Sequence, residues 1–210
     1  MQGIFSILDV LVPPTCRSCS ILLENSAATL CVECLLQVPT CVDVVDSPSS
    51  INMCWSMGAY DGMLGGLIRK AKYQPSISIS DELGHWLGRS LQEKVIVDAV
   101  VPVPTTYFRR LYRGFDQSER IANAVAKAMG IDLEHLLIRS GFSRQVGKTA
   151  EQRKKLRSHS FSMRKTVRHQ RVLLVDDVMT TGATLDAAGR RLRAHGVSDV
   201  YAAVVANSLV

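Results

Sequence analysis

The sequence predicts an α/β fold, in which helices cover both faces of a parallel sheet, with a small cysteine-rich module at the N-terminus. Two observations support this fold class. Apolar runs of strand length alternate with segments of helical periodicity from Ile51 onward, and five of the six cysteines lie in residues 13–45. Strands that alternate with helices are typical of parallel sheets. We expect residues 1–45 to hold an N-terminal helix and the cysteine module, and residues 51–210 to form the α/β domain.

The individual elements follow from periodicity and from turn residues. The expected strands are 52–60, 95–103, 171–175 and 200–206. The expected helices are 63–73, 80–93, 118–129 and 183–195, and glycines follow the last two. Residues 42–50 are polar and predict a linker. Residues 140–170 are rich in arginine and lysine and show no period, so we expect a long functional or disordered loop there.

Composition restricts the class of protein and of partner. A hydrophobic content of 47% and a charged content of 21% are typical of globular proteins and exclude a disordered chain. The net charge of +6 favours anionic partners such as nucleotides, phosphates, nucleic acid or a membrane face. The apolar residues 1–12 are too short to span a bilayer and lack the basic start of a signal peptide, so they predict a short packed helix. We expect a cytoplasmic protein without a membrane span, in which the cysteines are reduced.

The cysteines form two matched pairs. Cys16 and Cys19 are separated by two residues, as are Cys31 and Cys34, and eleven residues lie between the pairs. This spacing is typical of a zinc ribbon or knuckle, in which each pair directs two thiolates at one tetrahedral ion. A redox role is less favoured, because neither pair lies in a βαβ context. The sequence therefore predicts a structural Zn²⁺ at these four cysteines, with Cys41 as an alternative ligand.

An acidic pair follows the expected strand at 171–175. Asp176 and Asp177 lead into a loop that supplies three threonine hydroxyls, a glycine and the start of a helix near Ala183. Ligands bind at the carboxyl ends of such strands, and a helix N-terminus favours a phosphate group. The carboxylates would accept hydrogen bonds from sugar hydroxyls. The loop has neither the Walker pattern nor the dinucleotide glycine spacing. A site for a sugar phosphate is predicted; the alternative is a helix N-cap at Thr181 with acids placed to suit the helix dipole.

Residues 172–184 resemble the 5-phosphoribosyl-1-pyrophosphate motif of the type I phosphoribosyltransferases. The resemblance implies the parallel-sheet fold of that family. It also implies that Asp176 and Asp177 are the catalytic acidic pair that holds the ribose hydroxyls. The residues that would hold the 5-phosphate are Thr180, Thr181, Gly182, Ala183 and Thr184.

Three further segments resemble the ComF family of competence-associated, phosphoribosyltransferase-like proteins. One is Arg113-Gly114-Phe115-Asp116-Gln117, in which Asp116 stands where the family has asparagine; the others are Tyr60-Asp61-Gly62 and Ala71-Lys72-Tyr73. The resemblance places a diphosphate-binding loop after residue 103 and a flexible closing loop within residues 144–171. The cations that it assigns to these loops are Arg109, Arg113, Arg153 and Lys72. Such residues would neutralise diphosphate charge, although a solvated basic loop or a nucleic-acid contact is the alternative.

The resemblance implies a protein that binds 5-phosphoribosyl 1-pyrophosphate with Mg²⁺ and is linked to natural competence and DNA uptake or utilisation. It implies phosphoribosyl transfer to an acceptor that no residue identifies. The alternative is a non-catalytic zinc protein that senses the sugar diphosphate or binds single-stranded DNA, with other DNA-uptake proteins as partners. Residues 13–45 contain no aromatic side chain, which does not favour base stacking by the cysteine module.

Overall fold

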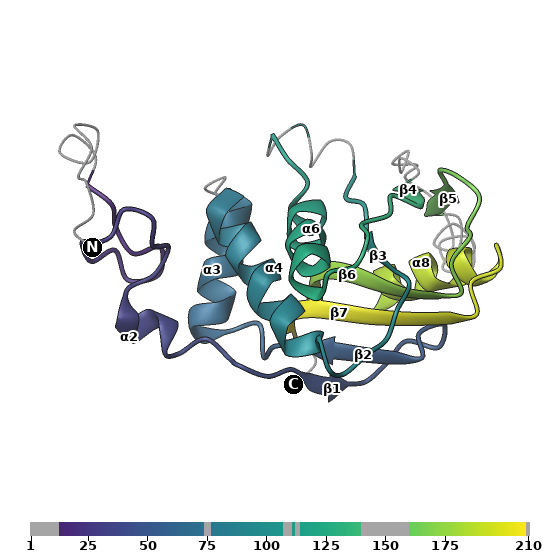
Figure 1. The fold of residues 1–210 in the computed structure, drawn as a ribbon, viewed down its shortest axis with the longest axis horizontal. Coiled ribbons are helices and arrows are strands. Elements are labelled where there is room, and N and C mark those ends of the chain that lie inside the picture. The colour runs from purple at the N-terminus through teal and green to yellow at the C-terminus, as the bar shows by residue number, and fades with distance from the viewer. Residues whose placement is uncertain (1–12, 74–76, 107–110, 112–113, 140–159, 209–210) are drawn as a thin grey trace, which may run out of the picture.

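A five-stranded sheet with the order β1-β2-β7-β6-β3 forms the centre of the computed structural model, which describes residues 13–73, 77–106, 111, 114–139 and 160–208 (Figure 1). The strands are β1 (Asp43–Val45), β2 (Met53–Ser56), β3 (Ala99–Pro102), β6 (Arg171–Met179) and β7 (Asp199–Asn207). Strands β2, β7, β6 and β3 run parallel, whereas β1 pairs with β2 in the antiparallel sense. The predicted α/β fold with a parallel sheet is confirmed.

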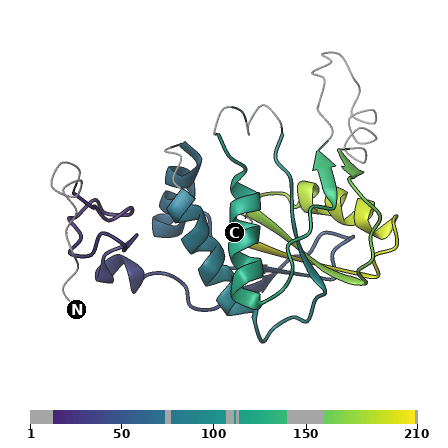
Figure 2. The same cartoon turned by 45° about the horizontal axis from the view of Figure 1, so that its top comes forward.

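Helices cover both faces of this sheet. The side that Figures 1 and 2 show in front carries α3 (Gly62–Tyr73), α4 (Ile77–Leu91) and α6 (Gln117–Met129), and α8 (Ala183–Arg193) lies on the opposite side. The remaining described elements are the short helix α2 (Val32–Leu35) and a two-stranded sheet of β4 (Leu137–Arg139) and β5 (Phe161–Met163).

The first half of strand β6, residues 172–175, is continuously apolar because both faces of the strand are buried. Leu173 and Val175 belong to the core beneath α3, α4 and α6, while Val172 and Leu174 belong to the core beneath α8. All four side chains are fully buried. Successive residues of a strand point to opposite faces, and both faces of this sheet are covered, so neither set of positions tolerates polar side chains.

Several predicted boundaries differ from the structure: β2 and β3 are shorter than the strands expected at 52–60 and 95–103, and α4 begins at Ile77 rather than at residue 80. In three further places a pairing partner extends or creates a strand. Strand β6 does not end at Val175; its parallel pairing with β7 continues through the acidic pair to Met179. The predicted linker at 42–50 contains β1, which pairs with β2. The region without periodicity contains β5, whose Phe161 is buried against the α8 side of the sheet. A three-residue strand has too little sequence to show a period of its own.

Helices α4 and α6 pack closely because α4 carries two glycines one turn apart. A Cβ atom at Gly84 would lie 2.4 Å from the carbonyl oxygen of Ile121, and one at Gly88 would lie 3.0 Å from the backbone of Val125. Because backbone atoms cannot swing aside, we predict that Gly84→Ala separates the helices and lowers the free energy of unfolding by about 2–3 kcal/mol. Denaturant unfolding followed by circular dichroism measures this change.

Gly66 provides the matched control for this variant. It lies in α3, and a Cβ atom there would meet no atom of the described residues within 4 Å. Gly66→Ala should therefore raise the free energy of unfolding slightly, by at most about 1 kcal/mol, since alanine is the better helix former. Equal stabilities for the two alanine variants would contradict the close packing of α4 on α6.

Candidate functional site

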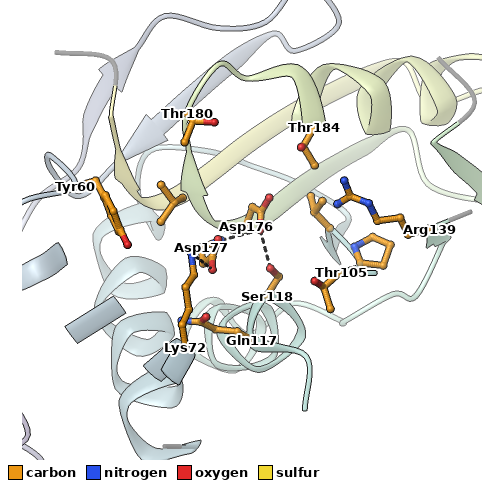
Figure 3. Close-up of a pocket in the computed structure, with 13 residues that line it drawn as sticks. Tyr60, Lys72, Thr105, Gln117, Ser118, Arg139, Asp176, Asp177, Thr180 and Thr184 are labelled. Carbon is orange, nitrogen blue, oxygen red and sulfur yellow. Dashed lines mark hydrogen bonds and ion pairs between the residues drawn. The ribbon is translucent and has the colours of Figure 1, made fainter. Parts of the chain in front are cut away.

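A pocket of about 390 Å³ lies at the carboxyl ends of the parallel strands (Figure 3). Its volume falls within the range of small-molecule sites. The residues that line it come from the segment after β2, from α3, from the loop after β3, from the start of α6, from β4, from the end of β6 with its following loop, and from the first turn of α8. The lining residues are Tyr60, Lys72, Val103, Pro104, Thr105, Gln117, Ser118, Arg139, Asp176, Asp177, Val178, Thr180 and Thr184.

The acidic pair occupies the middle of this pocket. One carboxylate oxygen of Asp176, Oδ1, accepts a hydrogen bond from the Ser118 hydroxyl at 2.6 Å and another from the backbone N–H of Asp177 at 2.9 Å. The Asp177 carboxylate pairs with the Lys72 ammonium at 2.9 Å. Burial and, after it, repulsion from Asp177 raise the pKa of Asp176 to about 7, although the Ser118 hydrogen bond acts in the opposite direction. Asp176 therefore changes its charge close to neutral pH.

The loop after β6 approaches the pocket with two of its predicted residues. Thr180 and Thr184 line the pocket, whereas Thr181 and Ala183 are exposed and lie outside the lining. Gly182 is the N-cap of α8, so the alternative of a Thr181 cap is wrong. Its φ of 69° is left-handed, and a Cβ atom there would lie 2.7 Å from the Pro48 side chain. Both the backbone angle and the close approach of residue 48 require glycine.

Of the four predicted cations, the structure describes one, Lys72. Lys72 belongs to the last turn of α3, where its ammonium contacts the Asp177 carboxylate. It therefore lies neither in the loop after β3 nor in the basic segment. The grouping of Lys72 with those loops is therefore wrong; helix packing carries it to the carboxyl edge of the sheet. Arg109, Arg113 and Arg153 lie outside the described residues. Arg139 was not predicted, yet it lines the pocket, and its guanidinium carbon lies 5.3 Å from the centroid of the Phe161 ring.

Asp116 is buried at the start of α6 and has a structural part in the site. One carboxylate oxygen accepts from the backbone N–H of Glu119 at 3.4 Å and caps the helix, and the other accepts from the N–H of Thr105 at 3.0 Å. Asparagine at this position could cap the helix, but its amide nitrogen could not accept from Thr105. The carboxylate thus fastens the loop after β3 to the helix that carries Ser118.

The four predicted cysteines come together at the N-terminal end of the described chain. The sulfur atoms of Cys16, Cys19, Cys31 and Cys34 all lie within 4.8 Å of one another, and the Cys19 and Cys31 sulfurs are 3.7 Å apart. Four thiolates around one Zn²⁺ lie about 3.8 Å apart, given zinc–sulfur bonds of about 2.3 Å, so the cluster is compatible with zinc. Cys41 is exposed and lies outside this cluster.

The thiols of this cluster differ in how readily they ionise: the pKa of Cys31 is raised to about 12 and the pKa of Cys34 is also raised, whereas the pKa of Cys16 is lowered. Burial alone would raise the pKa of Cys16, but hydrogen bonds from the backbone N–H groups of Cys19, Cys31 and Ser18 outweigh it and lower the pKa to about 6. N–H groups that point at a ligating atom are the outer-shell partners expected of a metal site. The cysteine module is also joined to α3, because the Lys70 ammonium donates to the carbonyl oxygen of Ser18 at 2.8 Å.

Within the part of the chain that the structure describes, no helix has both the length and the apolar character that a membrane span requires.

Comparisons with known proteins agree with these features. Residues 116–209 match the phosphoribosyl transferase domain. The chain is 28% identical over 198 residues to competence protein F of Haemophilus influenzae, which covers 89% of this chain and 82% of that protein. It is 24% identical over 184 residues to the DNA utilization protein YhgH of Escherichia coli, which covers 82% of this chain and 81% of that protein.

Two solved structures are similar over part of their length. An allosteric regulatory enzyme of purine biosynthesis superimposes with a TM-score of 0.46 at 24% identity, over 61% of this chain and 25% of that chain. Glutamine phosphoribosylpyrophosphate amidotransferase from B. subtilis gives a TM-score of 0.44 at 23% identity, over 60% of this chain and 26% of that chain. This chain thus spans about a quarter of each enzyme. The ComF resemblance is confirmed by the sequence relatives: the chain is a homologue of competence protein F with a phosphoribosyl transferase domain.

Proposed function

We propose that the pocket binds 5-phosphoribosyl 1-pyrophosphate. The observation that carries this proposal is the meeting of two adjacent carboxylates, Asp176 and Asp177, with the threonines of a helix N-terminus in one pocket. The carboxylates accept hydrogen bonds from the ribose hydroxyls. Thr180, Thr184 and the N-terminus of α8 bind the 5-phosphate. The match of residues 116–209 to the phosphoribosyl transferase domain supports the same ligand.

The diphosphate of this ligand lies toward the loop after β3. Thr105 lines that side of the pocket, and Arg139 supplies a cation there. Asp176 and Asp177 offer the oxygen ligands that Mg²⁺ prefers, and an Mg²⁺ ion held there would supply further neutralisation of the diphosphate charge. The chain's own residues orient the sugar and neutralise charge, and these are the contributions that phosphoryl and glycosyl chemistry need most from a protein.

Transfer of the phosphoribosyl group follows if a second reactant enters. A nucleophilic atom of that acceptor forms a bond to the anomeric carbon, the carbon–oxygen bond to the diphosphate breaks, and the oxygen keeps the electron pair. The proton of the acceptor leaves to solvent. The acidic pair holds the ribose during this displacement, and the cations receive the diphosphate.

The charge of Asp176 makes ligand binding depend on pH. Hydroxyl donors favour the ionised carboxylate, whose pKa of about 7 is well above the usual 3.8. Affinity for the sugar diphosphate should therefore fall as the pH falls through about 7. Because the Ser118 hydrogen bond lowers the pKa of Asp176, Ser118→Ala should move the fall to higher pH. Calorimetry of both proteins at several pH values measures the shift, and the ligand's own ionisation cancels between them. Superimposable profiles would contradict the role given to Ser118.

Thermal unfolding tests the proposed function. A ligand at roughly one hundred times its dissociation constant raises the free energy of unfolding by about 2.7 kcal/mol. We expect the sugar diphosphate with Mg²⁺ to raise the melting temperature, and ribose 5-phosphate to raise it less, because the latter lacks the diphosphate. No stabilisation by the sugar diphosphate at millimolar concentration would contradict the proposal.

A second candidate function is binding of single-stranded DNA, either instead of or together with the sugar diphosphate. The net charge of +6 and the homology to a protein named for DNA utilization support it. Much of the basic segment on which this candidate depends, including Arg153, lies outside the described residues. Retention of a single-stranded oligonucleotide that weakens steeply with salt supports this function, and retention that does not respond to salt opposes it.

The four clustered cysteines are further proposed to hold one structural Zn²⁺. The compact arrangement of their sulfurs supports this assignment. On this view the N-terminal helix and the zinc module lie within residues 1–45, and residues 51–210 form the phosphoribosyltransferase-like domain, whose sheet β1 (Asp43–Val45) extends.

A further inference from the structure

The segment between β1 and β2 packs against the loop that is proposed to bind the 5-phosphate. Gly182, the N-cap of α8, lies in this loop, and a Cβ atom there would lie 2.7 Å from Cγ of Pro48. Thr180 and Thr184, on either side of Gly182 in the chain, line the pocket (Figure 3), whereas residues 48–50 do not. The segment 48–50 therefore supports the phosphate loop from outside the pocket.

Asp186, in the first turn of α8, fastens this segment to the helix. Its carboxylate oxygen Oδ1 accepts from the Ser49 hydroxyl and from the backbone N–H of Ser50, each at 3.1 Å. The Ser50 hydroxyl donates in return to the backbone carbonyl oxygen of Asp186 at 2.8 Å. The other carboxylate oxygen pairs with the Arg190 guanidinium, and the Asp186 side chain is only 14% exposed. Hydrogen bonds in both directions thus join the segment 48–50 to the turn that follows the phosphate loop.

The segment 48–50 is itself held firmly. Its two ends lead into β1 and β2, which pair with each other. The N–H of Ile51 donates to the carbonyl oxygen of Pro48 at 2.9 Å, and the Ser50 carbonyl oxygen accepts from Nε of Arg193 at 2.8 Å. A Cβ atom at Gly189 would lie 2.5 Å from the Ser50 hydroxyl oxygen, so α8 and the segment are in close contact. A support that is fixed in this way can set the position of the loop beside it.

The charge of Asp186 by itself would oppose phosphate binding. A carboxylate in the first turn of a helix lies at the positive end of the helix dipole, which is also where an anion binds. The hydrogen bonds of Asp186 point to the segment 48–50 and to Arg190, and its side chain does not line the pocket. Any benefit of Asp186 to the ligand must therefore come from the geometry that it maintains.

We propose that Asp186 is a positioning residue for the 5-phosphate. By fastening the segment 48–50 against Gly182, it keeps Thr180, Thr184 and the N-terminus of α8 within hydrogen-bonding distance of the phosphate. Asp186 touches no ligand and acts through the loop. The inference rests on the proposed function, because it takes the ligand of the two threonines to be a phosphate.

Two variants of Asp186 separate its geometry from its charge. Calorimetry with ribose 5-phosphate is the readout, and diphosphate is the second probe. Asp186→Ala should weaken ribose 5-phosphate binding roughly tenfold, which corresponds to one lost hydrogen bond to a charged group, and should leave diphosphate binding unchanged. Asp186→Asn keeps an oxygen that accepts from both serine donors, so it should bind ribose 5-phosphate at least as tightly as the unaltered protein. If only the charge mattered, both variants would bind more tightly.

Asp98→Ala is the matched control for lost stability. The Asp98 carboxylate accepts from the backbone N–H groups of Gln170 and Arg171 and pairs with the Arg171 guanidinium, at the opposite end of β6 from the acidic pair. Asp98→Ala should therefore lower the melting temperature as Asp186→Ala does, yet leave ribose 5-phosphate binding unchanged. Pro48→Ala shortens the side chain that contacts Gly182 without altering α8, and it should weaken ribose 5-phosphate binding in the same direction as Asp186→Ala.

Unchanged or tighter ribose 5-phosphate binding in Asp186→Ala would overturn the proposal, as would an equal loss in Asp98→Ala or an equal loss of diphosphate binding. If the unaltered protein binds neither ribose 5-phosphate nor the sugar diphosphate, the proposed function fails instead. Amide hydrogen exchange without ligand then still tests the support that Asp186 gives to the loop. The backbone amides of residues 180–182 should exchange faster in Asp186→Ala than in Asp186→Asn, and equal rates would contradict that support.

Discussion

Replacing Cys16 or Cys31 with serine is expected to release one zinc ion per chain and to unfold the cysteine module. A structural zinc site contributes on the order of 10 kcal/mol of apparent binding energy, which is more than the rest of so small a module can supply. The structure adds a second consequence. Cys16, Leu23 and Leu30 share an apolar core with Leu64 of α3, so loss of the module exposes part of the domain core and promotes aggregation. Metal analysis and light scattering measure the two effects.

Cys41→Ser is the control for these variants. Cys41 is exposed and stands outside the cluster, so its replacement should leave both the zinc content and the melting temperature as they are. Two results would contradict the zinc assignment: protein purified without chelators that contains no zinc, and full zinc retention in Cys16→Ser.

The second large effect is expected from the double variant Asp176→Asn, Asp177→Asn. Each carboxylate is expected to accept a hydrogen bond from a ribose hydroxyl, and a hydrogen bond to a charged group contributes about 1.5–3 kcal/mol. Loss of both should reduce the affinity for the sugar diphosphate roughly a hundredfold or more, at about 1.4 kcal/mol for each factor of ten. The amides keep the shape of the site, so calorimetry on the folded variant reports the loss of the carboxylates themselves.

Single variants of the pair should change stability in opposite directions. The pKa of Asp176 is raised by burial from 3.8 to about 7, so between these pH values the unfolded chain loses the proton first and stability falls as the pH rises. At pH 8, Asp176→Asn removes this cost and should raise the free energy of unfolding by up to about 4 kcal/mol, at about 1.4 kcal/mol for each pKa unit. Asp177→Asn should lower it, because Lys72 loses its partner. If the pair only complemented a helix dipole, both variants would lose stability and neither would lose ligand.

Much of the site could be predicted because its chemistry is continuous in the sequence. Asp176, Asp177, Thr180 and Thr184 follow one another within nine positions, and strand β6 fixes where they emerge. The cysteine site was equally easy to predict, because the spacing of the two pairs alone indicates that all four sulfurs can bind one ion. Short sequence motifs of this kind can be recognised without knowing how distant elements pack.

The other residues of the pocket depend on tertiary packing. Lys72 and Asp177 are far apart in the chain and meet only because the last turn of α3 reaches the carboxyl edge of the sheet. Arg139 enters from a strand pair that the sequence did not indicate. Gln117 lay within a recognised motif, but nothing in the sequence showed that its amide would be buried without a hydrogen-bond partner among the described residues. Such contacts are set by helix and strand packing, which local patterns do not encode.

Calorimetric titration of the unaltered protein with 5-phosphoribosyl 1-pyrophosphate and Mg²⁺ tests the central claim most directly. We predict one site per chain, with tighter binding than either ribose 5-phosphate or diphosphate alone, because only the complete ligand contacts the threonines, the acidic pair and the Thr105 side of the pocket together. The folded double variant Asp176→Asn, Asp177→Asn, titrated in parallel, should bind roughly a hundredfold more weakly. Unchanged affinity in that variant, or no saturable binding by the unaltered protein, would contradict the assignment of this pocket to the sugar diphosphate.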